Sequence, residues 1–226
     1  KALFITAMDT NPLSGNPASL INDYKEDFKN GVKVLSRLTE GKTYVCHAKG
    51  ESLPVDSSGN VVLHGFEGPH PAGNVGTHIH FLDPAHTDKP VWYIGYQDVI
   101  AVGKLFSTGK LWTERVVALG GPQARNPRHL VARIGASLDD LLKNELEGKD
   151  IRVISGSVFN GHHAKNTFNY LGRYHNQISL LKEGKERELL GWGGPGLEKF
   201  SVKPSFLSKL LPAKLFDITT STHGSP

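Results

Sequence analysis

Two short apolar runs separated by one amphipathic stretch constrain the fold of this chain more than any other feature. The runs ALFITA, residues 2–7, and TYVCHA, residues 43–48, have the length and apolar content of buried strands. Between them, Asn16 and Pro17 form a typical helix start, and apolar residues then recur with a period of about 3.6. A strand, a helix and a strand in this order predict a βαβ unit with two parallel strands.

The same alternation continues to about residue 110. Further strands are predicted within residues 56–66, 77–82 (THIHFL) and 91–95 (VWYIG). Residues 96–109 predict a helix, because Gly109 stands where glycine favours a helix end. The first 112 residues are therefore predicted to form an α/β domain.

A different pattern follows from residue 113 to residue 170. Strands are predicted at 115–121, 126–136 and 150–161, and Ser137 begins a short helix between the last two. Several strands around one short helix suggest a small β-grasp-like module. The remaining segment, 171–226, is predicted to be rich in strands: two joined at Glu183-Gly184 and a last one in FDITTST, from residue 216.

Composition excludes several classes of protein. A single cysteine, Cys46, rules out an internal disulfide framework and a multi-cysteine metal site. The net charge is +4, and residues 199–216 carry four lysines and no acid, but no nucleic-acid motif accompanies them, so we expect no nucleic-acid partner. No run of about 18 apolar residues occurs, which argues against a membrane span. Both ends resemble cuts through a longer protein.

The stretch GPHPAGNVGTHIHF, residues 68–81, offers the strongest candidate for metal chemistry. On a strand, His78 and His80 would project from one face, and His70, Asp83 or His86 could supply a third ligand. A metal-dependent enzyme is therefore one alternative. The others are histidines bonded to backbone around a tight turn, and contact with an organic ligand or a neighbouring subunit.

Phosphate-binding and nucleophile motifs are weak. The first strand leads into MDTNPLSGNP rather than a glycine-rich turn. The pattern G-x-G-x-x-G occurs once, at 191–196, where Pro195 lies inside it and no helix start follows, so we interpret it as a turn. No G-x-S-x-G elbow is present.

Long stretches along the whole chain resemble a known family. LFITAMDTNPL, GPHPAGNVGTHIHFLDP, VWYIGYQDVIAVGKLF, RVVALGGPQARNPR and FLSKLLPAKLFDITT carry this resemblance. They are similar to the A subunits of Na⁺-translocating NADH:quinone oxidoreductases. The resemblance implies a Rossmann-like domain over 1–112, a soluble-ligand-binding β-grasp module over 113–170, and part of a barrel-sandwich domain over 171–226.

The resemblance also implies a function. The chain would be a peripheral subunit on the cytoplasmic face of the bacterial inner membrane, in a complex that couples NADH oxidation by ubiquinone to Na⁺ export. The complex would use NADH, flavins, an iron–sulfur centre and ubiquinone, whereas this chain would hold no cofactor, no metal and no catalytic residue. It would bind the other subunits, including membrane-embedded ones, and contact ubiquinone. The candidate contact residues are His70, His78, His80, Trp92, Gln97, Lys203 and Lys209.

Overall fold

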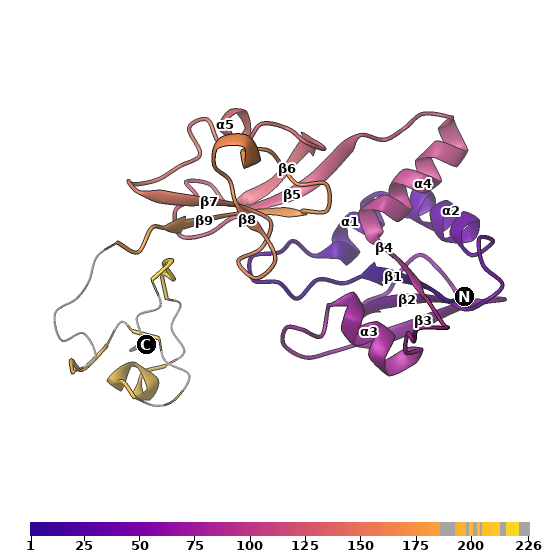
Figure 1. Ribbon diagram of the computed structural model, residues 1–226, viewed down its shortest axis with the longest axis horizontal. Helices are drawn as coiled ribbons and strands as arrows, with labels where there is room; N and C mark the ends of the chain where they lie inside the picture. The colour runs from indigo at the N-terminus through magenta and orange to yellow at the C-terminus, as the bar shows by residue number, and fades with distance from the viewer. Residues whose placement is uncertain (186–192, 198, 201–202, 204, 213–215, 222–226) are drawn as a thin grey trace.

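The computed structural model describes residues 1–185, 193–197, 199–200, 203, 205–212 and 216–221. Two sheets organise residues 3–182, a four-stranded sheet in the first half and a five-stranded sheet in the second (Figure 1). The protein is thus a mixed α/β chain. No helix among the described residues is long and apolar enough to cross a bilayer.

The first sheet is entirely parallel. Its strands lie in the order β3-β2-β1-β4. Their bounds are β1 (Leu3–Ala7), β2 (Thr43–Ala48), β3 (Val61–Phe66) and β4 (Trp92–Gly95). Because β1 pairs in parallel with β2, the βαβ unit predicted from the sequence is confirmed. The chain order reverses at β1, which has β2 on one side and β4 on the other.

Helices cover both faces of this sheet. They are α1 (Pro17–Asp23), α2 (Lys25–Leu35), α3 (Val75–Leu82) and α4 (Tyr96–Thr108). The single long helix predicted after Asn16 is two helices, because the backbone leaves the helical conformation at Tyr24, with φ −117° and ψ 36°. Gly109 ends α4 in the left-handed conformation, as predicted.

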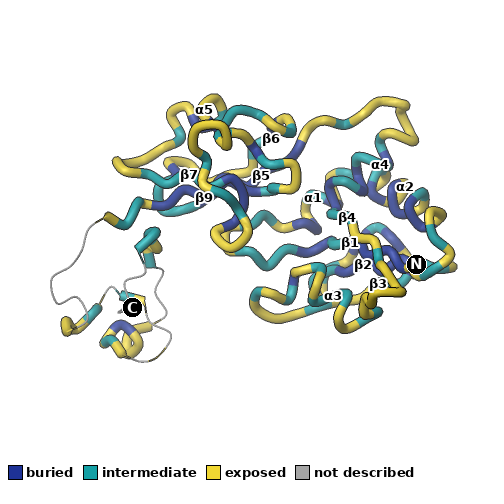
Figure 2. Tube along the Cα trace, in the orientation of Figure 1, coloured by how far each residue is buried: buried dark blue, intermediate teal, exposed yellow. Residues whose placement is uncertain are grey.

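Two apolar cores hold the first unit together, one on each face of the sheet. Helices α1, α2 and α4 pack over the face that carries Leu3 and Ile5, and α3 packs over the face that carries Phe4 and Cys46. Figure 2 shows that β1 and β2 are largely buried, whereas β3 and β4 are partly exposed. Burial raises the pKa of the Cys46 thiol to about 12, so this cysteine stays protonated and acts as an apolar residue.

The second unit is a mixed sheet in the order β6-β5-β9-β7-β8. Its elements are β5 (Glu114–Gly120), β6 (Arg128–Arg133), α5 (Leu138–Leu141), β7 (Ile151–Ser155), β8 (His162–His163), a 3₁₀ turn (Asn166–Phe168) and β9 (Gln177–Lys182). The strands predicted at 115–121, 126–136 and 150–161 are present, and Ser137 caps α5 by accepting a hydrogen bond from the Asp140 amide. The pair at 162–163, which follows a turn in the sequence, forms a short strand against β7.

Two predicted strands are wrong. THIHFL, residues 77–82, lies in α3, because Val75, Ile79 and Leu82 follow helical spacing and pack on the sheet with that one face. Residues 216–221 are not a strand, although the Thr220 amide donates to the Lys182 carbonyl. The second strand predicted after Glu183-Gly184 falls outside the described residues, and the C-terminal part that is described contains one 3₁₀ turn, Leu207–Leu210.

Candidate functional site

The histidine pair does not form the geometry that a metal site needs. Residues two apart on a helix point to different sides, since each residue turns the helix by about 100°. His78 is fully buried against Phe66 and donates from Nε2 to the Ala72 carbonyl at 2.9 Å, whereas His80 is exposed. Burial lowers the pKa of His78. Within the described residues, no group of three or more His, Cys, Asp or Glu side chains could hold a metal ion, so the metal-enzyme alternative has no support.

The start of α1, after the loop that follows β1, has features that disfavour phosphate binding. Helix α1 begins with Asn16, whose side chain accepts the Ala18 amide at 2.8 Å, and its first residue, Pro17, has no N–H. The Asn16 side chain also donates to the Glu51 carboxylate at 2.8 Å. A phosphate at this helix end would find one amide already bonded, no N–H on Pro17 and a carboxylate beside it.

A neighbouring part of the same sheet edge is open. A crevice of about 310 Å³ lies at the carboxyl ends of β1 and β4, where the order of the strands reverses. We name this space the switch crevice. Its walls include Thr6, Asn74, Gly95, Arg115 and Tyr174. Ligands of open parallel sheets bind at such reversal points, so this is the location where the fold itself favours a ligand.

Groups that can donate hydrogen bonds belong to residues that line the switch crevice. Both α3 and α4 begin there, at Asn74 and Gly95, without a side-chain cap. The hydroxyl of Thr6 and the Nε of Arg115 are buried and have no hydrogen-bond partner among the described residues, and Arg115 is only 4% exposed. A Cβ added at Gly95 would meet nothing within 4 Å. The crevice can therefore accommodate a small ligand that accepts hydrogen bonds.

A polar cluster behind the crevice joins the two units. The Gln97 carboxamide donates to the Val116 carbonyl at 2.8 Å and accepts the Val116 amide at 2.9 Å. Asp98 accepts from Arg115 at 2.8 Å and lies 3.0 Å from Arg173. Gln97 is a contact candidate from the sequence; its side chain is buried, makes these bonds within the protein and belongs to a residue that lines the crevice, so a ligand contact stays a prediction.

The remaining candidates are spread over the molecule. His70 lies near the crevice, 3.2 Å from the Thr10 hydroxyl, with its ring 4.9 Å from that of Phe159 in the second unit. Trp92 begins the edge strand β4 and is 60% exposed. Lys209 lies over the Phe200 ring in the C-terminal segment, which also contains Lys203. These residues do not converge on one site.

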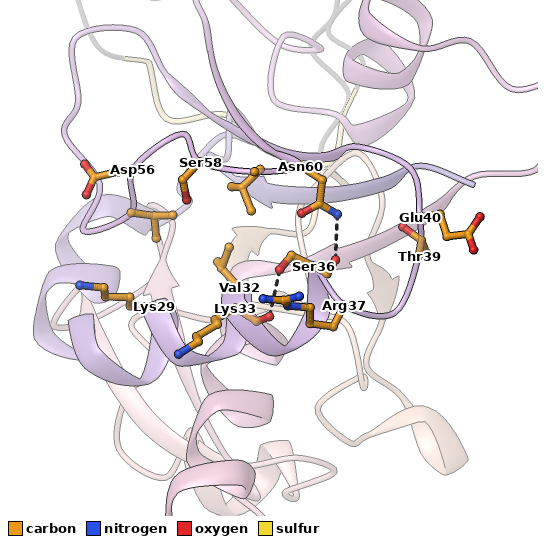
Figure 3. Close-up of a pocket in the computed structure, with 13 residues that line it drawn as sticks. Lys29, Val32, Lys33, Ser36, Arg37, Thr39, Glu40, Asp56, Ser58 and Asn60 are labelled. Carbon is orange, nitrogen blue, oxygen red and sulfur yellow. Dashed lines mark hydrogen bonds between the residues drawn. The ribbon is translucent and has the colours of Figure 1, made fainter.

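A larger cleft, about 710 Å³, lies at the opposite, amino-terminal edge of the first sheet (Figure 3). We name it the basic cleft. Helix α2 supplies Lys29 and Lys33 along one wall, the turn after it supplies Arg37, and the loop before β3 supplies Asp56 and Ser58 along the other wall. The Asn60 amide joins the two walls by donating to the carbonyl of Ser36 at 2.8 Å. Sequence reasoning missed this cleft, although the four-residue spacing of the cations was visible.

Two family models match the chain. Residues 1–111 match the model described as "NqrA second alpha/beta domain", and residues 116–166 match the one described as "NQRA C-terminal domain". The chain belongs to the NqrA family. The resemblance drawn from the sequence stretches is thereby confirmed.

NqrA relatives are similar along the whole chain. The chain is 56% identical over 225 residues to the A subunit of the Na(+)-translocating NADH-quinone reductase of Vibrio parahaemolyticus, and equally identical to that of Vibrio alginolyticus. Identity to the corresponding protein of Hahella chejuensis is 54% over 224 residues. The chain spans 50% of the length of these relatives.

The fold has relatives far from NqrA in sequence. A crystal structure of the NAD+-reducing [NiFe]-hydrogenase in the H2-reduced state superposes with a TM-score of 0.58 at 12% identity, over 80% of this chain and 40% of that one. The air-oxidised state gives a TM-score of 0.57. At this identity the likeness concerns the fold alone.

Proposed function

We propose that the chain is part of the NqrA subunit of a Na⁺-translocating NADH-quinone reductase, and that it acts there as a scaffold without a cofactor of its own. The observation that carries this proposal is the 56% identity that extends over 225 residues. In this proposal the domains are a Rossmann-like one over 1–112, a β-grasp module over 113–170, and a β-rich segment over 171–226 that belongs to a barrel-sandwich domain. The strand order β3-β2-β1-β4 supports the first assignment.

The structure around α1 supports a scaffold rather than a nucleotide-binding role. A Rossmann-type pyrophosphate lies at the first helix after β1 and needs free amides and close approach of a glycine. Here Asn16 caps the helix, and a Cβ at Gly15 would lie 2.4 Å from Nε2 of His129, so the side of this glycine that faces the second unit is occupied. The proposed chemistry of the complex, with NADH, flavins and an iron–sulfur centre, then belongs to other subunits.

We also propose that ubiquinone contacts NqrA at the switch crevice. A quinone headgroup is a neutral ring whose carbonyl oxygens accept hydrogen bonds. The Thr6 hydroxyl, the Arg115 Nε and the two uncapped helix starts offer donors, and the exposed ring of Tyr174 offers an aromatic surface at the rim. Asp98 pairs with both Arg115 and Arg173, and Asp9 also lines the crevice, so two carboxylates offset two guanidinium groups, which favours a neutral ligand over an anion.

Docking to the membrane-embedded subunits, at the cytoplasmic face of the inner membrane, would use the C-terminal segment with Lys203 and Lys209 and the edge at Trp92. All three side chains are exposed at the surface of the described part of the protein. The half-buried His70 and the exposed His80 are further candidates, whereas His78 and Gln97 are buried and hydrogen-bonded to the backbone.

A chimaera tests the proposed function directly. This chain replaces the matching 225 residues of the Vibrio alginolyticus NqrA protein, and the assembled complex is assayed for Na⁺-dependent quinone reduction by NADH. Assembly and activity comparable to the parent support the proposal. A chimaeric protein that folds but fails to join the complex contradicts it.

The quinone contact has its own test, with a matched glycine pair. Calorimetric titration of the chain with a short-chain ubiquinone should show binding that Gly95→Ala weakens, because the added methyl enters the crevice. Gly76→Ala is the control, since its Cβ also meets nothing within 4 Å and Gly76 does not line the crevice. Equal affinity in all three proteins would rule out the crevice as the quinone contact.

A further inference from the structure

The basic cleft carries a regular row of cations. Lys29, Lys33 and Arg37 follow one another at four-residue spacing, and all three are exposed. Lys29 and Lys33 lie four residues apart in α2, a step of about 6 Å along the helix, and Arg37 follows in the turn after the helix. No ion-pair partner for these three side chains occurs in the described part of the chain, whereas Lys104 of the neighbouring α4 pairs with Asp27. The row is therefore available to an outside partner.

The floor of the cleft beneath this row is apolar. Val32, Val55 and Val61 line it, and each is at most 9% exposed. The second wall is the loop before β3, which presents the Ser58 hydroxyl and backbone (Figure 3). An occupant of the cleft would thus meet cations on one side, backbone and hydroxyl groups on the other, and valine side chains below.

The cation row also borders a second hollow. Lys33 and Arg37 line both the basic cleft and an adjoining space of about 390 Å³ that contains the exposed ring of Phe106. The two cations therefore stand on the ridge between two concave surfaces. This arrangement lengthens the surface that one elongated partner could cover.

The distance between successive cations of the row indicates which backbone conformation of a partner would match it. In an extended chain, every second side chain points the same way, and such residues are about 6.6 Å apart. This nearly equals the ~6 Å step of the cations. We propose that the basic cleft binds an extended segment of a partner protein that carries acidic residues at alternate positions. The proposal rests on the cleft alone and holds whether or not the chain contacts quinone.

A flat anionic surface fits the site less well than such a segment. The valine floor lies at the bottom of a concavity of about 710 Å³, which a bilayer headgroup plane cannot enter. Glu40 and Asp56 also line the cleft and would repel a uniform sheet of phosphates, while a single strand can place its acids on the α2 side only.

The test uses a synthetic peptide. A fluorescein-labelled heptapeptide of alternating glutamate and serine is titrated with the full chain, and anisotropy reports binding at low and at high NaCl concentration. The comparison variant is Lys29→Glu/Lys33→Glu/Arg37→Glu. The matched control is Lys110→Glu/Lys143→Glu/Lys149→Glu, which changes the net charge equally at exposed lysines outside the cleft. Vesicles containing phosphatidylglycerol and inorganic phosphate form two further arms.

The expected result is saturable binding of the alternating peptide that weakens at the higher salt concentration, because ion pairs at a surface are screened. The cleft variant should lose about tenfold or more of the affinity, since three surface pairs are replaced by repulsions, and the control should lose much less. A peptide of the same composition with its glutamates adjacent should bind more weakly. Equal losses in the two triple variants, no saturable binding of the alternating peptide, or binding of vesicles or phosphate alone would overturn the proposal.

Discussion

The carboxyl-terminal and amino-terminal ends of the strands in the first sheet differ in what packs against them. At the carboxyl end, the second unit packs against the loops: Gln177 donates to the Pro12 carbonyl at 2.8 Å, and Ser157 donates to Asn11 at 2.9 Å. The switch crevice stays open beside these contacts. At the amino end, the basic cleft is formed by the first unit alone and faces outward.

The difference shows how a sheet of this kind can be adapted. Its usual ligand edge is narrowed by the second unit, whose His129 ring occupies one side of Gly15 in the turn after β1. The opposite edge, away from the usual ligand position of open parallel sheets, carries the larger cleft and the row of cations.

The largest loss of stability should come from a substitution in the contact between α2 and α4, because these helices border both ends of the first sheet. Gly103→Ala would place a Cβ 1.8 Å from the Asp27 carbonyl oxygen of α2, so the two helices must separate. We expect a loss of about 3 kcal/mol in the free energy of unfolding, measured by urea denaturation. Gly76→Ala, in a helix with open space around it, should instead stabilise by up to about 1 kcal/mol. Similar effects of the two substitutions would show that the α2–α4 contact is looser than described.

The second largest loss of stability should come from Gln97→Leu, and its effect on ligand binding should be confined to the carboxyl end of the first sheet. Gln97→Leu leaves the Val116 amide and carbonyl unpaired in a buried place, which costs about 2–3 kcal/mol. Gln123→Leu is the control, because that side chain makes a longer, 3.3 Å contact with the Pro122 carbonyl. Gln97→Leu should also alter quinone binding and leave peptide binding in the basic cleft unchanged. If both sites change together, the two ends are not independent.

Acid should destabilise the protein through its buried histidines. Burial lowers the pKa of His78 below its ordinary value of 6.5, and burial followed by the nearby His162 does the same for His175. The unfolded chain then binds more protons, so stability is complete above about pH 6.5 and falls as the pH drops through that value toward the folded-state pKa. One pKa unit corresponds to about 1.4 kcal/mol.

Thermal unfolding between mildly acidic and neutral pH measures how steeply the stability changes with pH. A His78→Leu variant should keep only part of this pH dependence. A variant with His80→Ala, at an exposed position of the same helix, should keep all of it. Identical slopes in the three proteins would contradict the role given to the buried ring.

The smallest effect on stability should come from two threonines, one at each edge of the first sheet, whose substitutions should differ only in ligand binding. Thr6 at the carboxyl end and Thr43 at the amino end each have a buried hydroxyl without a partner among the described residues. Replacing either by valine should stabilise by at most about 1 kcal/mol, because no hydrogen bond is lost. Only Thr6→Val should weaken binding of the short-chain ubiquinone. Equal binding by both variants would remove Thr6 from the proposed contact.

Much of the fold was predictable because its signals are local. The apolar runs of β1 and β2, the Asn16-Pro17 helix start, the Ser137 cap and Gly109 each act within a few residues. The segment 77–82 was assigned to the wrong class because Val75 and Ile79, which define the helical face, lie on both sides of its start. In so short a stretch, alternation and helical spacing cannot be separated.

The candidate site was less predictable because it depends on contacts between distant segments. Gln97 could be singled out as a residue, but its partners Val116 and Asn176 are brought to it by the second sheet. The switch crevice requires the strand order β2-β1-β4, and the basic cleft requires the loop before β3 to lie along α2. Neither arrangement is encoded in a short motif.

The most direct test of the scaffold account is a calorimetric titration of the chain with FMN and with NADH. Because Asn16 already accepts the Ala18 amide, Pro17 has no N–H and the His129 ring occupies one side of Gly15, we predict no stoichiometric binding of either molecule. Weak binding that disappears in the Lys29→Glu/Lys33→Glu/Arg37→Glu variant would come from the basic cleft and leave the account intact. Stoichiometric binding that persists in this variant would contradict it.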